Sequence, residues 1–165
     1  MNVLVIAATE RELIGIKETS FTQPSVVVQT AVTGVGLLPS TYAIMQLISG
    51  LKPDLIIQIG IAGSFNPAIR LGAAVVVGRE VIADMGVHEK DGYHDIFELG
   101  LAEQNTPPFE LGAIVNHHAN LIEAASLPVV SGVSVNEIST NPQKIILFAE
   151  KYKADIESME GAALH

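Results

Sequence analysis

Short runs of β-branched and other apolar residues recur along the chain and constrain its fold more than any other feature. They occupy residues 3–8, 25–32, 54–60, 73–77 and 127–135. Several of these runs are apolar without alternation, which is expected when helices cover both faces of a sheet. We therefore predict that they are strands of a largely parallel sheet, and that the fold class is α/β.

Two helices are predicted between these strands. The first opens at Pro39 and Ser40 and ends at Gly50 and Pro53. Its apolar positions follow helical spacing, and they are Ile44, Leu47, Ile48 and Leu51. The second has Asn141 as its cap and Pro142 at its first position. One side of this second helix carries Ile145, Phe148, Ala149 and Tyr152, and the ADIES stretch after it is a short strand candidate.

Size and charge limit the classes of function. A chain of 165 residues with 48% hydrophobic content suits one domain over residues 1–165. Its net charge of -9 argues against a nucleic-acid partner, because phosphate backbones are bound by clustered cations. No apolar run approaches the roughly 20 residues that a membrane helix needs, and there is no cysteine. We expect a cytoplasmic protein with no membrane partner.

The segment from residue 81 to residue 108 mixes acids, histidines and glycines, and it is expected to be a long surface loop. His88 and His94 have a spacing that fits no standard zinc pattern, so no metal site is expected. The lone Ser131 and Ser134 have no nucleophile elbow around them. Serine hydrolase chemistry is therefore not indicated.

Two glycine turns follow predicted strands. TGVG, at residues 33–36, precedes a helix, and its glycines would let backbone N–H groups approach a ligand. GIAGSF, at residues 60–65, lies at the carboxyl end of the most apolar strand, where open α/β sheets bind ligands. Neither is a dinucleotide fingerprint. TGVG alone can equally be a plain tight turn, and the alternative for GIAGSF is close packing at a strand exit. Together the two turns modestly favour a small-molecule site.

Four acids lie near predicted strand ends: Glu10, Glu12, Glu157 and Glu160. Hydrolysis of a glycosidic bond needs a carboxylate that activates water and a proton donor for the leaving group. Acids at helix starts are also favoured by the helix dipole, so a structural role stays open for each of them.

Five pieces in this order resemble the purine nucleosidase and nucleoside phosphorylase family, whose fold is a mixed central sheet wrapped by helices. They are AATEREL, TGVG, QIGIAGSF, VSGVSVNEI and ESMEGAA, spread from residue 7 to residue 163. Within that family, the middle loop and the ESMEGAA form are most similar to the futalosine hydrolases of menaquinone biosynthesis. The resemblance implies a purine nucleosidase that releases hypoxanthine from futalosine, with no cofactor and a homo-oligomeric assembly.

The resemblance also implies roles for single residues. Glu12 matches the carboxylate that activates the attacking water, Glu160 the one that grips the ribose hydroxyls, and Met159 the residue that packs on the sugar. The other implied substrate-binding positions are Val35 and Gly36 on the ribose side, Ala62 and Gly63 beside the base, and Val135 and Asn136 in the wall that reads the purine edge. Glu157 and Ser158 receive no firm role.

Water is expected to be the nucleophile. Phosphorylases of this family hold phosphate with arginines, and charge-assisted bidentate donors suit that task. This chain has only Arg11, Arg70 and Arg79, and none lies in the QIGIAGSF turn. A nucleoside phosphorylase therefore ranks below a nucleosidase.

Other readings stay open. A 5'-methylthioadenosine or S-adenosylhomocysteine nucleosidase is the nearest enzymatic alternative. In the family, the helix that starts at Met159 and Glu160 continues into a further strand that supplies the residue facing the purine N7. We therefore expect that the C-terminal strand and helix are missing from this chain. A non-catalytic nucleoside-binding remnant is the alternative from another class.

Overall fold

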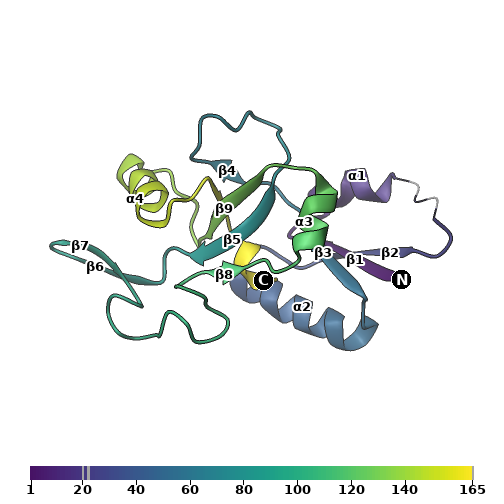
Figure 1. Ribbon diagram of the computed structural model, residues 1–165, viewed down its shortest axis with the longest axis horizontal. Helices are drawn as coiled ribbons and strands as arrows, with labels where there is room; N and C mark the ends of the chain where they lie inside the picture. The colour runs from purple at the N-terminus through teal and green to yellow at the C-terminus, as the bar shows by residue number, and fades with distance from the viewer. Residues whose placement is uncertain (20, 22, 165) are drawn as a thin grey trace. The chain divides into compact units, whose positions relative to one another are not determined.

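The computed structural model describes residues 1–19, 21 and 23–164. The chain forms two compact units, one made of Met1–Ile61 with Leu164 and the other of Ala62–Ala163, and each is described by itself. Figure 1 labels the elements of both. Among the described residues, no helix has the length and apolar character that crossing a membrane requires. A single domain over residues 1–165 stays a prediction.

Both units mix strands and helices. The first unit contains β1 (Asn2–Ala7), η1 (Glu10–Leu13), α1 (Ile14–Lys17), β2 (Val27–Val32), α2 (Leu37–Leu51) and β3 (Leu55–Gln58). The second contains β4 (Gly63–Ser64), β5 (Val76–Ile82), β6 (Gly86–Glu89), β7 (Gly92–Asp95), β8 (Ile114–Val115), α3 (Ala119–Ala125), β9 (Val129–Ser134), α4 (Pro142–Tyr152), β10 (Ile156–Ser158) and η2 (Gly161–Ala163). The predicted α/β class is confirmed.

The sheet of the first unit is entirely parallel, in the order β2-β1-β3. Residues 3–7 of the central strand β1 are all buried. This confirms that the non-alternating run VLVIA is covered on both faces of its sheet. The edge strand β2 is less covered, and its residues are exposed or half-buried.

Helix α2 is confirmed, although its end and its buried face differ from the prediction. Gly50 lies inside the helix, and Lys52 ends it in a left-handed conformation with φ of 46°. Ile44 is buried, but Ile48 and Leu51 are exposed. The helix therefore buries a narrower stripe than the spacing predicted, and it leaves apolar side chains in solvent.

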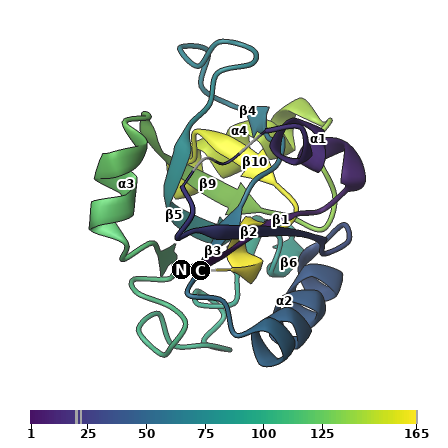
Figure 2. The same ribbon diagram turned by 90° about the vertical axis from the view of Figure 1, so that its right-hand side faces the viewer.

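The main sheet of the second unit is mixed, with the order β4-β10-β9-β5-β8. Its three central strands β10, β9 and β5 are parallel, as Figure 2 shows, and the short β4 and β8 join them antiparallel. Helix α4 begins as predicted, because the Asn141 side chain accepts from the N–H of Gln143 at 2.8 Å. Its buried residues Phe148 and Tyr152 pack into a core with Val81 and Val133.

The expected long loop at residues 81–108 is wrong in its first part. Strand β5 runs on to Ile82, and β6 and β7 form an antiparallel hairpin. Lys90 and Asp91 make the two-residue hairpin turn, and Gly92 directly after it pairs with Glu89.

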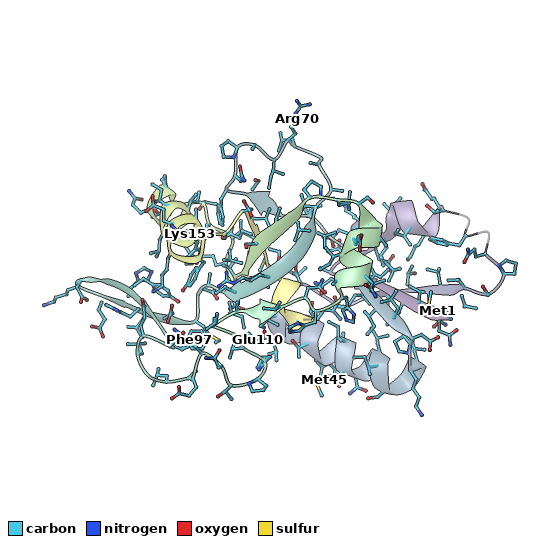
Figure 3. The ribbon with its side chains drawn as sticks, viewed as in Figure 1. Met1, Met45, Arg70, Phe97, Glu110 and Lys153 are labelled. Atoms are coloured by element: carbon cyan, nitrogen blue, oxygen red, sulfur yellow. The ribbon has the colours of Figure 1, made fainter. Side chains whose placement is uncertain are left out.

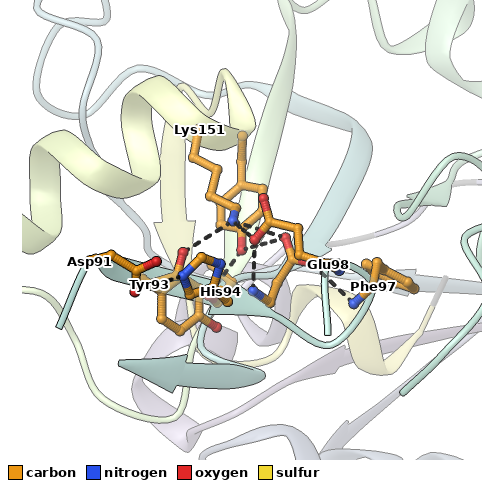
Figure 4. A network of polar contacts seen from close by, with 9 residues as sticks. Asp91, Tyr93, His94, Phe97, Glu98 and Lys151 are labelled. Atoms are coloured by element: carbon orange, nitrogen blue, oxygen red, sulfur yellow. Dashed lines mark hydrogen bonds and ion pairs between the residues drawn. The ribbon is translucent and has the colours of Figure 1, made fainter. Parts of the chain in front are cut away.

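Lys151 of α4 anchors this hairpin (Figure 4). Its ammonium group lies 3.3 Å from the buried Asp95 carboxylate and also pairs with Glu98. The Lys151 hydrogen bond lowers the pKa of the Glu98 carboxyl. The segment is thus tied to the core of the second unit rather than extended from it.

Candidate active site

The ends of the parallel strands in the first unit position Glu12. The carboxyl ends of β1, β2 and β3 meet at one edge, where Ala7 pairs with Val32 and Ile6 with Gln58. Ligands in open α/β sheets bind at such edges. Strand β1 leads to Thr9, which caps the short helix η1, and Glu12 is the third residue of that helix.

Three donors hold the Glu12 carboxylate. Its Oε2 atom accepts from the N–H and from the hydroxyl of Thr9, both at 2.8 Å. Its Oε1 atom accepts from the N–H of Ile61 at 3.1 Å. A Cβ at Gly60 would lie 3.1 Å from Oε1, so the absence of a side chain there lets the turn after β3 pass close to the carboxylate. The side chain is fixed in orientation and half-buried.

The TGVG turn lies at the end of β2. Thr33 and Gly34 donate their N–H groups to Ala7 and Ala8 at 2.9 and 3.2 Å. Gly34 and Gly36 have φ of 87° and 96°, a region that favours glycine. Gly36 precedes the first residue of α2, and Val35 is exposed. The two predicted ribose-side residues therefore lie at a helix N-terminus on the same sheet edge as Glu12.

The second unit gathers its predicted residues at another strand edge. Ser134 of β9 pairs with Ser158 of β10, and the next residues of these strands are Val135 and Met159. Gly63 pairs with Glu157 in the antiparallel β4, directly after Ala62. The structure thus brings together Ala62, Gly63, Val135, Asn136, Met159 and Glu160, and separately Glu12, Val35 and Gly36 in the first unit.

The N–H groups of the expected purine wall are already engaged. Val135 is buried and donates its N–H to the carbonyl of Ser158 at 3.0 Å. Asn136 donates its N–H to Asp84 Oδ2 at 2.5 Å and its amide to Oδ1 at 3.2 Å. Asp84 was missed from the sequence because it fell in the presumed loop. Base reading by this wall stays a prediction.

Glu157 anchors the loop after this wall. It is 2% exposed, and its two oxygens accept from the N–H and hydroxyl of Ser139 at 2.9 and 2.5 Å. A buried carboxylate with two donors fixes the loop that follows Asn136. The acid without a role in the sequence is therefore a structural anchor.

Glu80 was also missed from the sequence. It lies on β5, is 1% exposed, and accepts from the hydroxyl of Ser134 at 2.7 Å. Among the described residues, its Oε2 atom has no hydrogen-bond partner. Burial raises the pKa of this carboxyl to about 7, against smaller lowering effects of the Ser134 and Ser158 hydroxyls. The signal in the sequence was an acid inside an apolar strand.

The described residues contain one cluster with ligand atoms at metal-binding spacing. Glu89, Asp91 and His94 have such atoms within 4.8 Å of one another at the hairpin turn. Glu89 and Asp91 are exposed, and His94 Nε2 lies 3.3 Å from Asp91 Oδ1. Exposed acidic groups of this kind are common without a metal, and the cluster stands apart from the strand edge with Met159 and Glu160 along the chain.

Comparisons with known proteins agree on one family. The family model described as the phosphorylase superfamily matches residues 10–165. Futalosine hydrolase of Thermus thermophilus is 28% identical over 134 residues, which are 79% of this chain and 58% of that protein. The chain therefore spans less than two thirds of the length of this curated relative.

Solved structures share the fold. A 5'-methylthioadenosine/S-adenosylhomocysteine nucleosidase of Neisseria meningitidis, in complex with methylthio-immucillin-A, aligns with a TM-score of 0.77 at 20% identity, covering 98% of this chain and 77% of that one. The futalosine hydrolase of Helicobacter pylori strain 26695 aligns with a TM-score of 0.77 at 14% identity, covering 98% and 76%. At these identities the likeness concerns the fold.

Proposed function

The chain belongs to the phosphorylase superfamily, and from this premise we propose that it acts as a purine nucleosidase, which hydrolyses the N-glycosidic bond of a nucleoside. The observation that supports this most is the fixed Glu12 carboxylate at the strand edge. A general base must be held where it can reach the proton that it abstracts.

The hydrogen bonds of Glu12 indicate which atom takes the proton. An ionised carboxylate has about four lone-pair positions, two on each oxygen. Among the hydrogen bonds of the described residues, Thr9 makes two to Oε2, whereas Ile61 makes one to Oε1. We therefore assign the attacking water to Oε1, which takes the water proton as the water oxygen bonds to the sugar carbon and the base departs.

Glu160 and Met159 are proposed to bind the ribose, and the turn at Val35 and Gly36 to line the ribose side. Ala62 and Gly63 are proposed to flank the base, with Val135 and Asn136 forming its wall. Carboxylate contacts to sugar hydroxyls would hold the ring while positive charge develops on it.

Hydrolysis is favoured over phosphorolysis by the surroundings of the arginines. Arg79 Nη1 donates to the carbonyl of Tyr152 at 3.3 Å, so this guanidinium serves the packing of α4. Arg70 lies on the protruding segment between β4 and β5 (Figure 3). Arg11 is exposed. Purine release that does not depend on phosphate is the expected result.

Futalosine is the proposed substrate, which would place the enzyme in menaquinone biosynthesis, on the strength of the relative from Thermus thermophilus. The test is purine release by the purified full chain from futalosine and from 5'-methylthioadenosine, with and without phosphate. Hypoxanthine from futalosine supports the proposal, whereas adenine release alone would move the substrate to the methylthioadenosine class. Binding without release would favour a nucleoside-binding protein.

Glu12→Gln tests the assigned base. We expect a loss of at least about a hundredfold in the rate of purine release, the usual contribution of a general base. Glu10→Gln is the matched control, because Glu10 is two residues away, exposed and paired with Lys17. Equal activity of Glu12→Gln and wild type would remove Glu12 from the mechanism.

A second copy of the chain is the proposed protein partner. One side of α2 exposes Leu38, Tyr42, Met45 and Ile48, spaced four, three and three residues apart, and Figure 3 labels Met45. Contiguous exposed apolar surface of this kind marks interaction sites. Sedimentation velocity should give a dimer that Met45→Glu dissociates, and a monomer at high concentration would refute it.

A further inference from the structure

We infer that Glu80 is a positioning residue for the turn at residues 158–162, which it holds through the hydroxyl group of Ser134. This turn contains Met159 and Glu160, so the inference rests on their proposed role in ribose binding. It adds a residue with no expected contact to the substrate.

Ser134 forms the first link. Its Oγ atom accepts from the N–H of Ala162 at 2.9 Å and donates to Glu80 Oε1 at 2.7 Å. Because the backbone N–H can only donate, Ser134 accepts from Ala162, and its own proton is directed to the ionised Glu80 carboxylate. The carboxyl of Glu80 thereby sets the Ser134 rotamer in which Oγ can accept the hydrogen bond from the N–H of Ala162.

Ser158 forms the second link. Its Oγ atom accepts from the N–H of Gly161 at 3.1 Å. The nearby Ser158 hydroxyl also lowers the pKa of Glu80 slightly. The two N–H groups that follow Glu160 are therefore donated to two serine hydroxyl oxygens, and the Ser134 hydroxyl is in turn bonded to the buried Glu80 carboxyl.

Two glycines make room for this arrangement. A Cβ at Gly161 would lie 2.5 Å from Glu80 Oε1, and a Cβ at Gly132 would overlap the carboxylate. Glu80 pairs with Gly132 in the sheet, so the carboxyl lies against the backbone of β9. The glycines of the VSGVSV and ESMEGAA stretches thus leave the space that the side chain of Glu80 occupies.

Retention of a buried acid at this place needs an explanation beyond stability. Within the part of the chain that the structure describes, Glu80 Oε2 has no hydrogen-bond partner, and burial of such a carboxyl is costly. The N–H groups at a helix start can donate hydrogen bonds to other acceptors, including water. Glu80 instead fixes the turn on a strand of the sheet, and small misplacements of a substrate-binding group have large effects on binding and rate.

The test uses the full chain and compares Glu80→Ala with Glu80→Gln, which keeps an acceptor for Ser134. Two readouts are needed: hydrogen exchange of the Gly161 and Ala162 amides, and the dissociation constants of a nucleoside and its free base. Futalosine with hypoxanthine is the first pair, and methylthioadenosine with adenine the second.

We expect Glu80→Ala to speed exchange at both amides and to weaken the nucleoside about tenfold, which is the effect of losing one or two hydrogen bonds. The free base should bind to Glu80→Ala as tightly as to wild type. Glu80→Gln should bring both the amide exchange and the nucleoside dissociation constant to within about threefold of the wild-type values. Ser134→Ala with Ser158→Ala should reproduce Glu80→Ala, and this pair takes its place if that variant does not fold.

Equal weakening of nucleoside and base would mean a general structural role and would overturn the inference, as would unchanged exchange at both amides. If the wild type binds no nucleoside, the proposed function fails by itself. The exchange of Gly161 and Ala162 in the same variants then still decides whether Glu80 positions the turn.

Discussion

Replacing Glu80 by glutamine should make the free energy of unfolding less dependent on pH. The wild-type carboxyl has its pKa raised from 4.5 to about 7 by burial. The folded state therefore holds the proton more tightly than the unfolded state. This stabilisation is complete below about pH 4.5, and it is lost as the pH rises toward 7.

The magnitude follows from the shift. At roughly 1.4 kcal/mol for each pKa unit, the shift corresponds to about 3 kcal/mol, most of which falls between pH 5 and pH 8. Glu80 is 1% exposed, so solvent screening reduces this value little. A neutral glutamine keeps the acceptor for Ser134 and carries no such dependence.

The assay is urea unfolding followed by circular dichroism at about pH 5 and pH 8. The stability of Glu80→Gln minus that of wild type should rise by about 2–3 kcal/mol over this range. Glu123→Gln, at an exposed position on α3, is the matched control, and its stability relative to wild type should not change with pH. If the stability of Glu80→Gln relative to wild type also does not change with pH, the argument is refuted, since the buried carboxyl would then ionise without penalty.

Three further substitutions test other contacts. Gly161→Ala should destabilise the chain by about 1–3 kcal/mol, because the Glu80 carboxylate must leave its Ser134 bond, and Glu80→Ala in the same chain should relieve part of that loss in a double-mutant cycle. Lys151→Met should cost about 2–4 kcal/mol in chemical unfolding, because it leaves the buried Asp95 without its cation; no change would mean that Asp95 is well solvated. Asn141→Ala should cost about 1 kcal/mol through the lost cap of α4, whereas Asn141→Ser should preserve most of the stability.

The predictable part of the fold comes from side-chain patterns that act locally. Residues 3–7 of strand β1 are all apolar because both faces of the strand are buried there, and α4 carries a cap and a periodic apolar face. The hairpin of β6 and β7 escaped prediction because both strands are largely polar and β6 is exposed throughout. The Asp91–Gly92 pair was the available signal, and it was read as part of a loop.

For the candidate site too, the residues with a local motif could be predicted, and the contacts between distant parts of the chain could not. Glu12 could be proposed from its motif, but its three donors come from Thr9 and Ile61, and Ile61 is 49 positions away along the chain. The partners of Asp84 and Glu80 are likewise about 50 residues distant. Such pairs depend on strand register, which no local pattern specifies.

The fit of Glu80 between two glycines has a consequence for how this family can vary. Positions 80, 132 and 161 form one steric unit, because a side chain at either glycine position needs the space that the carboxyl occupies. Among related sequences, a smaller residue at position 80 should permit alanine or serine at 132 or 161, and glutamate should restrict both to glycine. Substitutions at the three positions should therefore be inherited together, although they lie 29 or more residues apart along the chain.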